Sequence, residues 1–193
     1  MITSKTDHCK TLEEFYVSIR EQQEEYHGMH YCDQHDMIRR LMVDCDTYKE
    51  LGVHQGATAA NALIHCNPTK VELVDISLEK YNWSKDLFRT YCDDNDIELV
   101  VKESSSIKPK SRSRTDLLLI DSLHKPDYLT QELRYHAEYV NKYIVFHDTS
   151  MLNRTPNDAL YKVIEKFCNE LNPWEIIERH TDNVGCMAIK RTV

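Results

Sequence analysis

From residue 48 onward the sequence alternates short apolar runs with longer helical stretches, and this alternation limits the fold more than any other feature. The pattern is typical of a parallel sheet covered by helices, because each strand is then buried on both faces. Strands are expected at 48–53, 70–75, 97–103, 116–121 and 143–148, and a final β-rich pair at 174–180 and 185–191. Helices are expected at 57–66, 78–93, 126–140 and 156–171, with Ser77 and Thr155 as N-caps.

The final pair surrounds a polar turn, which predicts an antiparallel hairpin. The predicted fold class is therefore α/β: a Rossmann-like, doubly wound sheet of seven strands, mostly parallel, with a C-terminal antiparallel hairpin and helices on both faces. Two more helices are expected before the first strand, one capped by Thr11 together with Glu14 and one from about Asp36. We interpret residues 1–47 as helices that flank or cover a site, with plain packing as the alternative, and 48–193 as the ligand-binding part of one compact domain.

Length, charge and cysteine spacing narrow the classes of function. The chain has 193 residues and a net charge of −8, so it suits one domain and gives no reason to expect a nucleic-acid partner. Its seven cysteines are scattered without a C-x-x-C pair, which predicts free thiols in a reducing compartment. No apolar run approaches the roughly 20 residues that span a bilayer. We therefore expect a cytoplasmic protein with no membrane partner.

A pair of glycines marks the turn after the first expected strand. Gly52 and Gly56 lie where a buried strand passes into a helix, in the spacing E-x-G-x-x-x-G that starts at Glu50. Glycines there let the backbone approach a ligand, and the N–H groups of the following helix point at it. His54 replaces the middle glycine that a pyrophosphate needs, so the spacing favours S-adenosylmethionine over a dinucleotide. An ordinary strand-to-helix turn is the alternative.

An acidic residue, Asp75, ends the second expected strand. In the nucleotide-binding fold, a carboxylate at this place accepts hydrogen bonds from the ribose hydroxyls. Capping of the next helix is the alternative interpretation.

Polar residues also follow the fourth and fifth apolar runs. Asp121 and His124 follow the fourth run, and His147 and Asp148 follow the fifth. If these strands are neighbours, about 4.8 Å apart, Asp121 and Asp148 can reach one hard cation such as Mg²⁺. Such a cation lowers the pKa of a bound hydroxyl, and His124 is placed to take its proton. The alternatives are a helix-capping Asp121, a surface His124 and a purely structural pair of His147 with Asp148.

Four segments together resemble one known group of enzymes. They are E-L-G-V-H-Q-G-A-T at 50–58, L-V-D-I at 73–76, L-L-I-D-S-L-H at 118–124 and I-V-F-H-D-T at 144–149. From about residue 48 to 193 the chain resembles class I S-adenosylmethionine-dependent methyltransferases, especially the metal-dependent O-methyltransferases of the catechol, sugar and cephalosporin hydroxylase-like group.

The resemblance implies that S-adenosylmethionine lies across the first three strand ends. It implies a cofactor-binding role for Glu50, Gly52, His54, Gly56, Asp75, Glu103, Ser104 and Asp121. It implies that Asp121 and His124 are catalytic, with His124 as the general base, and that Asp121, Asp148 and His147 form the metal site, with Mg²⁺ as the expected ion. The relatives commonly have a carboxylate where this chain has His147, and imidazole suits Zn, Fe or Ni better than Mg²⁺. His147 pointing away from the ion, a different metal and a site without function remain open.

We therefore expect S-adenosylmethionine-dependent O-methylation of a small-molecule hydroxyl, such as that of a sugar or an anionic metabolite, assisted by a divalent metal. The alternatives are a nicotinamide-dependent Rossmann oxidoreductase and a non-catalytic cofactor-binding module. The basic loop at 104–114 lacks hydrophobic anchors and is expected to be mobile; it either gates the site and attracts an anionic acceptor or is a solvated linker. The identity of the acceptor and the formation of a homo-oligomer are left open by the sequence.

Overall fold

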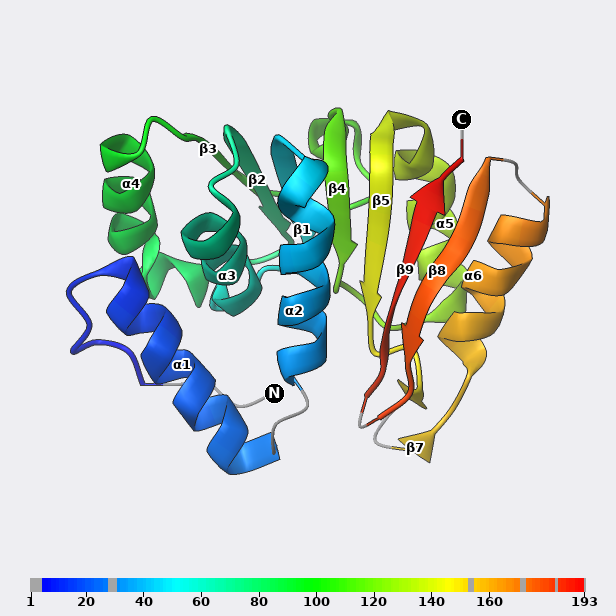
Figure 1. Ribbon diagram of the computed structural model, residues 1–193, viewed down its shortest axis with the longest axis horizontal. Coiled ribbons are helices and arrows are strands. Elements are labelled where there is room, and N and C mark those ends of the chain that lie inside the picture. Colours follow the sequence, from blue (N-terminus) through cyan, green and yellow to red (C-terminus); the bar gives the residue numbers. More distant parts are fainter. Residues whose placement is uncertain (1–4, 28–30, 153–154, 171–172, 183, 193) are drawn as a thin grey trace.

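The computed structural model describes residues 5–27, 31–152, 155–170, 173–182 and 184–192. Its main sheet has seven strands in the order β3-β2-β1-β4-β5-β9-β8, as Figure 1 shows. The strands are β1 (Thr47–Leu51), β2 (Lys70–Asp75), β3 (Glu98–Glu103), β4 (Thr115–Ile120), β5 (Val140–His147), β8 (Trp174–His180) and β9 (Cys186–Arg191). The first five run parallel, whereas β9 is antiparallel to both β5 and β8. The predicted α/β class, strand number and C-terminal hairpin are confirmed.

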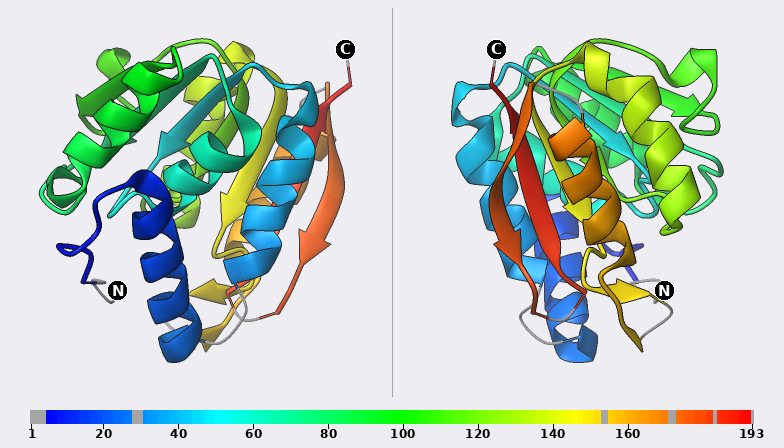
Figure 2. Two further views of the ribbon diagram at one scale, coloured as in Figure 1. Left: turned by 60° about the vertical axis from the view of Figure 1, so that its left-hand side comes forward. Right: turned by 90° about the vertical axis from the view of Figure 1, so that its right-hand side faces the viewer.

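Helices cover both faces of the sheet, as the two views of Figure 2 show. They are α1 (Leu12–His27), α2 (Tyr31–Leu41), α3 (Ala57–Cys66), α4 (Lys85–Asp94), α5 (Pro126–His136) and α6 (Ala159–Glu170). Short 3-10 turns are η1 (Met42–Asp44), η2 (Tyr81–Trp83), η3 (Pro109–Ser111) and η4 (Ala137–Tyr139), and a small ribbon joins β6 (Met151–Leu152) to β7 (Thr155–Pro156). Helices α1 to α4 pack on one face, and α5 and α6 pack on the other.

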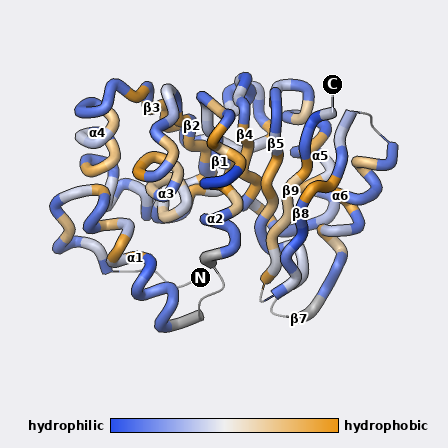
Figure 3. Tube along the Cα trace, viewed as in Figure 1, coloured by the Kyte–Doolittle hydropathy of each residue, from blue (hydrophilic) through white to orange (hydrophobic). Residues whose placement is uncertain are grey.

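Hydrophobic residues follow one another along the central strands, as Figure 3 shows. These strands pack against helices on both faces, which explains their uninterrupted hydrophobic runs. In β4, Leu117 and Leu119 pack in the cluster that includes α1, α2 and α3, while Leu118 and Ile120 pack in the cluster that includes α5 and α6. Alternate side chains of a strand point to opposite faces, so one strand supplies both cores. Because these five strands run parallel, their carboxyl ends meet at one edge of the sheet.

The predicted helix caps are partly wrong. Thr11 accepts the N–H of Glu14 at 3.2 Å, as expected for the cap of α1. Ser77 does not cap α4, because η2 intervenes and α4 begins only at Lys85. Thr155 does not cap α6 either, because it pairs in the β6–β7 ribbon before the helix begins at Ala159. Helix α2 begins at Tyr31, earlier than the expected Asp36.

The connection from β3 to β4, residues 104–114, contains only a 3-10 turn and covers a buried ion pair. Lys49 and Glu72 lie 2.9 Å apart, both nearly inaccessible to solvent, and Ser113 of the connection hydrogen-bonds to each. The Arg112 guanidinium lies 4.0 Å from the centre of the Tyr135 ring of α5. The loop is therefore held by polar and cation-π contacts, and its expected mobility stays a prediction.

Two expectations from composition can be compared with the structure. The cysteines whose side chains are described are free thiols, and the side chain of Cys32 lies outside the described residues. Among the described residues, none of the helices combines the length and the apolar character needed to cross a bilayer.

Candidate active site

The turn that follows β1 is clamped between the ends of β2 and β4. The N–H of Gly52 donates to the carbonyl of Val74 at 2.9 Å, and the N–H of Asp121 donates to the carbonyl of Leu51 at 2.8 Å. Gly52 has φ +91, and a Cβ there would lie 2.0 Å from the backbone oxygen of Asp121. Both the backbone conformation and the space therefore require glycine.

Asp75 fastens the rest of this turn. Its Oδ2 accepts the N–H groups of Val53 at 2.7 Å and His54 at 3.0 Å, and its Oδ1 accepts the N–H of Ser77 at 3.0 Å. His54 has a left-handed φ of 50, and its Nε2 lies 2.7 Å from Nζ of Lys80. A carboxylate has about four acceptor positions. A ribose hydroxyl would thus use the remaining position of Asp75 or displace one of these backbone donors.

Three carboxylates, those of Glu50, Asp75 and Asp121, surround the glycine turn. The side chain of Glu50 is 2% exposed, and its Oε2 accepts a hydrogen bond from the Tyr48 hydroxyl at 2.7 Å. Burial raises the pKa of Glu50 well above its usual value; the Tyr48 hydrogen bond opposes this, and the charges of Asp121 and Asp75 raise the pKa further. Glu50 is therefore held in its neutral form, and the negative charge beside the turn comes from Asp75 and Asp121. These two charges favour a cationic ligand and disfavour a pyrophosphate.

The end of β3 adds two residues next to Asp75. Glu103 is the register partner of Asp75, and its Oε2 accepts the N–H of Leu78 at 3.3 Å. The N–H of Ser104 donates to the backbone oxygen of Asp75 at 2.7 Å. Ile76, directly after Asp75, is 75% exposed. All the expected cofactor residues thus lie at, or directly follow, the carboxyl ends of β1 to β4: Glu50, Gly52, His54, Gly56, Asp75, Glu103, Ser104 and Asp121.

Four side chains from the ends of β4 and β5 form a closed cluster. Asp121 Oδ1 lies 3.0 Å from His124 Nε2 and 3.1 Å from His147 Nδ1. Asp148 Oδ2 lies 2.5 Å from His124 Nδ1, and its Oδ1 lies 3.3 Å from His147 Nδ1. The two strands are neighbours, as expected, so each histidine contacts both carboxylates. Asp148 has a left-handed φ of 56, a strained conformation for a residue with a side chain.

The charges in this cluster shift the pKa values of its members. Burial disfavours the charged form of His124, but the hydrogen bonds and charges of Asp121 and Asp148 outweigh it and raise its pKa to about 10. Burial likewise opposes ionisation of Asp121, yet His147 and His124 hold its pKa below the usual value. In this geometry His124 is protonated at neutral pH. It can act as a general base only where a cation offsets the two carboxylates.

The same cluster offers donor atoms for a metal ion. Asp121, His124 and His147 each contribute one ligand atom, and these atoms lie within 4.8 Å of one another. Mg²⁺ takes oxygen ligands, whereas imidazole nitrogen suits Zn²⁺, Fe²⁺ or Ni²⁺. This donor set does not fit the Mg²⁺ that we expected. Asp148, the expected second oxygen ligand, is not one of these three donors; its carboxylate contacts both histidines instead.

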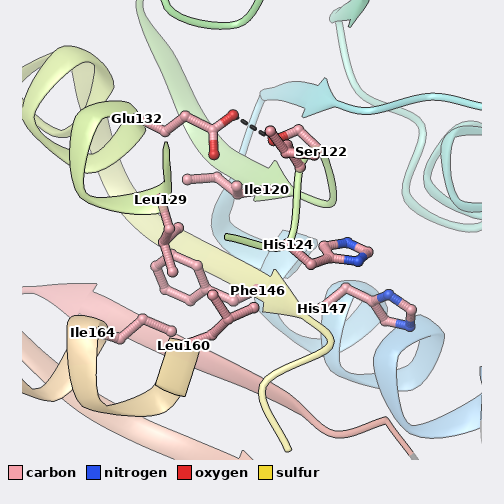
Figure 4. A pocket seen from close by; sticks show the side chains of 10 residues that line it. Ile120, Ser122, His124, Leu129, Glu132, Phe146, His147, Leu160 and Ile164 are labelled. Atoms are coloured by element: carbon pink, nitrogen blue, oxygen red, sulfur yellow. Dashed lines mark hydrogen bonds between the residues drawn. The ribbon is translucent and has the colours of Figure 1, made fainter. Parts of the chain in front are cut away.

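A small cavity lies behind the cluster, between the ends of β4 and β5 and the helices α5 and α6 (Figure 4). Its volume of about 10 Å³ is room for about one water molecule, so it does not hold a methyl acceptor. Glu132 lines it and is 1% exposed; Ser122 donates to its Oε1 at 2.5 Å, while its Oε2 has no hydrogen-bond partner among the described residues. Burial raises the pKa of Glu132 to about 7.

Sequence reasoning missed Glu132 and Tyr48. A signal for Glu132 exists, because Leu129, Glu132, Leu133 and His136 follow helical spacing and are the buried residues of α5. A carboxyl group on the apolar face of a helix is rare unless it is partnered or functional. Tyr48 carries no comparable signal, since a tyrosine in a buried strand is ordinary.

Comparison with known proteins bears on the fold. No protein-family model and no curated protein sequence matches the chain. Among solved structures, the ribosomal protein L11 methylase of Lactobacillus delbrueckii subsp. bulgaricus is 20% identical with a TM-score of 0.62, covering 86% of this chain and 81% of that chain. The N-methyltransferase NodS of Bradyrhizobium japonicum, in complex with S-adenosyl-L-homocysteine, is 10% identical with a TM-score of 0.64, covering 94% and 97%.

An O-methyltransferase family protein of Burkholderia thailandensis is 10% identical with a TM-score of 0.61, covering 93% of this chain but 59% of that chain. These likenesses show that the chain has the Rossmann-like methyltransferase fold. The three names include a ribosomal protein methylase, an N-methyltransferase and an O-methyltransferase. The shared fold therefore does not select one acceptor.

Proposed function

We propose that this chain is an S-adenosylmethionine-dependent methyltransferase. The observation that carries the proposal is the glycine turn enclosed by Glu50, Asp75 and Asp121. S-adenosylmethionine carries a sulfonium and an ammonium group against one carboxylate, and it has no phosphate. Opposite charges favour its binding at this edge, whereas the two negative charges of a dinucleotide pyrophosphate would be repelled.

The residues of the turn have distinct roles in this proposal. Gly52 lets the backbone approach the methionine part of the cofactor, and Asp75 accepts hydrogen bonds from the ribose. Glu103 pairs with Asp75 in the register and Ser104 bonds to its backbone oxygen, at the place where the adenine would extend. The exposed Ile76 offers that ring an apolar surface.

The proposed acceptor is a hydroxyl oxygen of a small molecule. Asp121 belongs to both the glycine turn and the cluster, so an acceptor oxygen held at the cluster lies next to the methyl sulfonium. A divalent ion, when bound, supplies the charge that lowers the pKa of the hydroxyl. In this proposal Asp121 and His147 hold and orient the site, and the helices of residues 1–47 flank it.

The basic loop bears on the charge of the proposed acceptor, and two of its four cations already contact neighbouring groups. Arg112 stacks on Tyr135, and Lys110 donates to the backbone oxygen of Glu103 at 3.3 Å. Both cations are already engaged. Lys108 and Arg114 of the same loop are exposed, so both a neutral hydroxyl compound such as a sugar and an anionic metabolite remain proposed acceptors.

Calorimetric titration of the purified chain with S-adenosylmethionine, S-adenosylhomocysteine and NADH tests the cofactor class. Both adenosyl ligands are expected to bind, NADH is not, and Asp75→Asn should weaken binding about tenfold, since a hydrogen bond to a charged group is lost. Asp93→Asn, an exposed carboxylate on α4, is the control for charge alone. Binding of NADH in place of S-adenosylmethionine would support the oxidoreductase, and binding without any methyl transfer to a hydroxyl library would support the non-catalytic module.

A further inference from the structure

The geometry points to a nitrogen-rich site for a first-row transition ion, such as Zn²⁺, Co²⁺ or Fe²⁺, formed by Asp121, His124 and His147. In this inference Asp148 does not bind the ion; it orients the ring of His124. This inference deepens the proposed function, since it names the kind of ion at the same site. It also changes two expectations, because it makes His124 a ligand rather than the general base and takes Asp148 out of the ligand set.

The spacing of the donor atoms suits such an ion. A tetrahedral Zn²⁺ with bonds of about 2.0–2.1 Å separates its ligand atoms by about 3.3 Å. Asp121 Oδ1 lies 3.0 Å from His124 Nε2 and 3.1 Å from His147 Nδ1. These two distances lie within a few tenths of an ångström of that spacing, and the donor nitrogens of His124 and His147 lie within 4.8 Å of each other. Asp121 directly follows β4 and His147 ends β5, two neighbouring strands that fix the backbone positions of these two residues, while His124 lies in the connection that leads from β4 to α5.

Asp148 supplies the second observation. The two ring nitrogens of His124 face different carboxylates: Nε2 faces Asp121, and Nδ1 lies 2.5 Å from Asp148 Oδ2. Histidines that bind metals almost always donate their other N–H to a carboxylate, a carbonyl or water, which fixes the tautomer and the ring orientation. Asp148 holds its place through a strained left-handed backbone, with φ 56. Strain of this kind persists where the surrounding structure requires it.

The chemistry of the donors selects the ion. Two imidazole nitrogens and one carboxylate oxygen form the set that zinc enzymes and non-haem iron enzymes use, with positions left for water or substrate. Mg²⁺ demands near-octahedral oxygen ligands and gives up its water reluctantly. The site should therefore bind Zn²⁺ or Co²⁺ in the presence of a large excess of Mg²⁺.

The test uses Co²⁺ as a coloured probe on chelator-treated protein. We expect one Co²⁺ per chain with a visible absorption band of low-coordinate nitrogen ligation, displaced by Zn²⁺ and unaffected by a thousandfold excess of Mg²⁺. His147→Gln should lower Co²⁺ affinity at least a hundredfold. Asp148→Asn should lower it by about ten- to a hundredfold while the band remains. His8→Ala, which removes an exposed histidine outside the cluster, should change nothing.

Several results would overturn the inference. Displacement of Co²⁺ by Mg²⁺ at comparable concentration would do so, as would full Co²⁺ binding in His147→Gln, or no binding of either ion to the folded protein. Circular dichroism establishes that each variant is folded. Calorimetry with S-adenosylmethionine on the metal-free protein separates this inference from the proposed function: cofactor binding without Co²⁺ binding removes only the metal site, and the reverse removes only the cofactor.

Discussion

The carboxyl edge of the sheet has two halves that are held together in different ways. At the ends of β1 and β2, backbone groups do most of the holding, with Gly52 clamped between two strands and Asp75 accepting backbone N–H groups. At the ends of β4 and β5, side chains hold one another, through His124, His147 and their carboxylate partners. The first arrangement follows from the fold, whereas the second depends on these particular side chains.

Asp121 belongs to both halves. Its backbone N–H bonds to Leu51 and its carbonyl lies where a Cβ of Gly52 would be, while its carboxylate contacts both histidines. A change of its backbone surroundings should therefore disturb the whole edge. A change of its carboxylate should disturb only the cluster.

The largest effect is expected from Gly52→Ala. The new Cβ would lie 2.0 Å from a backbone oxygen at φ +91, so backbone must move, and we expect the free energy of unfolding to fall by about 4 kcal/mol with loss of cofactor binding. Gly56→Ala is the matched control. It has nearly the same φ, but its Cβ would meet only the tip of the Phe88 ring at 2.7 Å. Urea denaturation measures the free energy of unfolding of both variants. An equal decrease in the two would mean that the left-handed φ alone requires glycine, and that the close approach of the Asp121 backbone to Gly52 adds nothing.

Asp121→Asn should act on the cluster alone. In the metal-free protein we expect the pKa of His124 to fall from about 10 toward its ordinary value by at least one unit, because Asp121 contributes both a hydrogen bond and a charge. Histidine ring resonances in an NMR titration measure this. A pKa of His124 that stays unchanged would show that Asp148 alone holds its proton.

The same variant has a predictable effect on stability. A raised histidine pKa stabilises the folded state below the unfolded value of 6.5, and that contribution is lost as pH rises toward about 10. The wild-type chain should therefore lose stability between pH 7 and pH 10 more steeply than Asp121→Asn. Urea midpoints at these two pH values check the slope.

Much of the fold was predictable because burial on two faces leaves continuous apolar runs in the sequence. The glycine turn was also predictable, since left-handed backbone at Gly52 restricts the residue type. The prediction that Asp121 and Asp148 lie near one site followed from one assumption, that β4 and β5 are neighbours, which the register bears out. Both carboxylates contact the same two histidines there.

The remaining features depend on distances that spacing does not determine. The path of the chain through η2 moved the cap of α4 away from Ser77. The side-chain orientation of Asp148, toward His124, decides which donors are left for an ion. The raised pKa of His124 follows from two carboxylates on opposite sides of one ring, and no sequence pattern encodes that arrangement.

Glu132→Gln tests whether the buried carboxyl group of Glu132, beside the ends of β4 and β5, lowers the stability of the folded chain when it ionises. The unfolded carboxyl group ionises near pH 4.5 and the folded one near pH 7, so wild-type stability should fall as pH rises through this interval. We expect the variant to be more stable than wild type by about 2 kcal/mol at pH 8 and similar at pH 5, because glutamine keeps an oxygen for the Ser122 hydroxyl. A variant that is less stable at pH 8 would mean that the ionised carboxylate has a partner or a bound water that offsets its burial.

The smallest effect is expected outside both halves, in the connection from β3 to β4. Arg112→Gln removes the cation from the rings of Tyr135 and Tyr139, at 4.0 and 5.0 Å, and at an exposed site this should cost about 1 kcal/mol. Hydrogen exchange should quicken in residues 105–114, while cofactor affinity should stay the same, because Gly52 and Asp75 are held from β1, β2 and β4 and the N–H of Ser104 bonds to the backbone of Asp75. Lys108→Gln, an exposed cation of the same loop, is the control. Weaker cofactor binding in Arg112→Gln would mean that the backbone contacts at the ends of β1 and β2 are not sufficient to form the cofactor site. Residues 105–114 would then contribute to it.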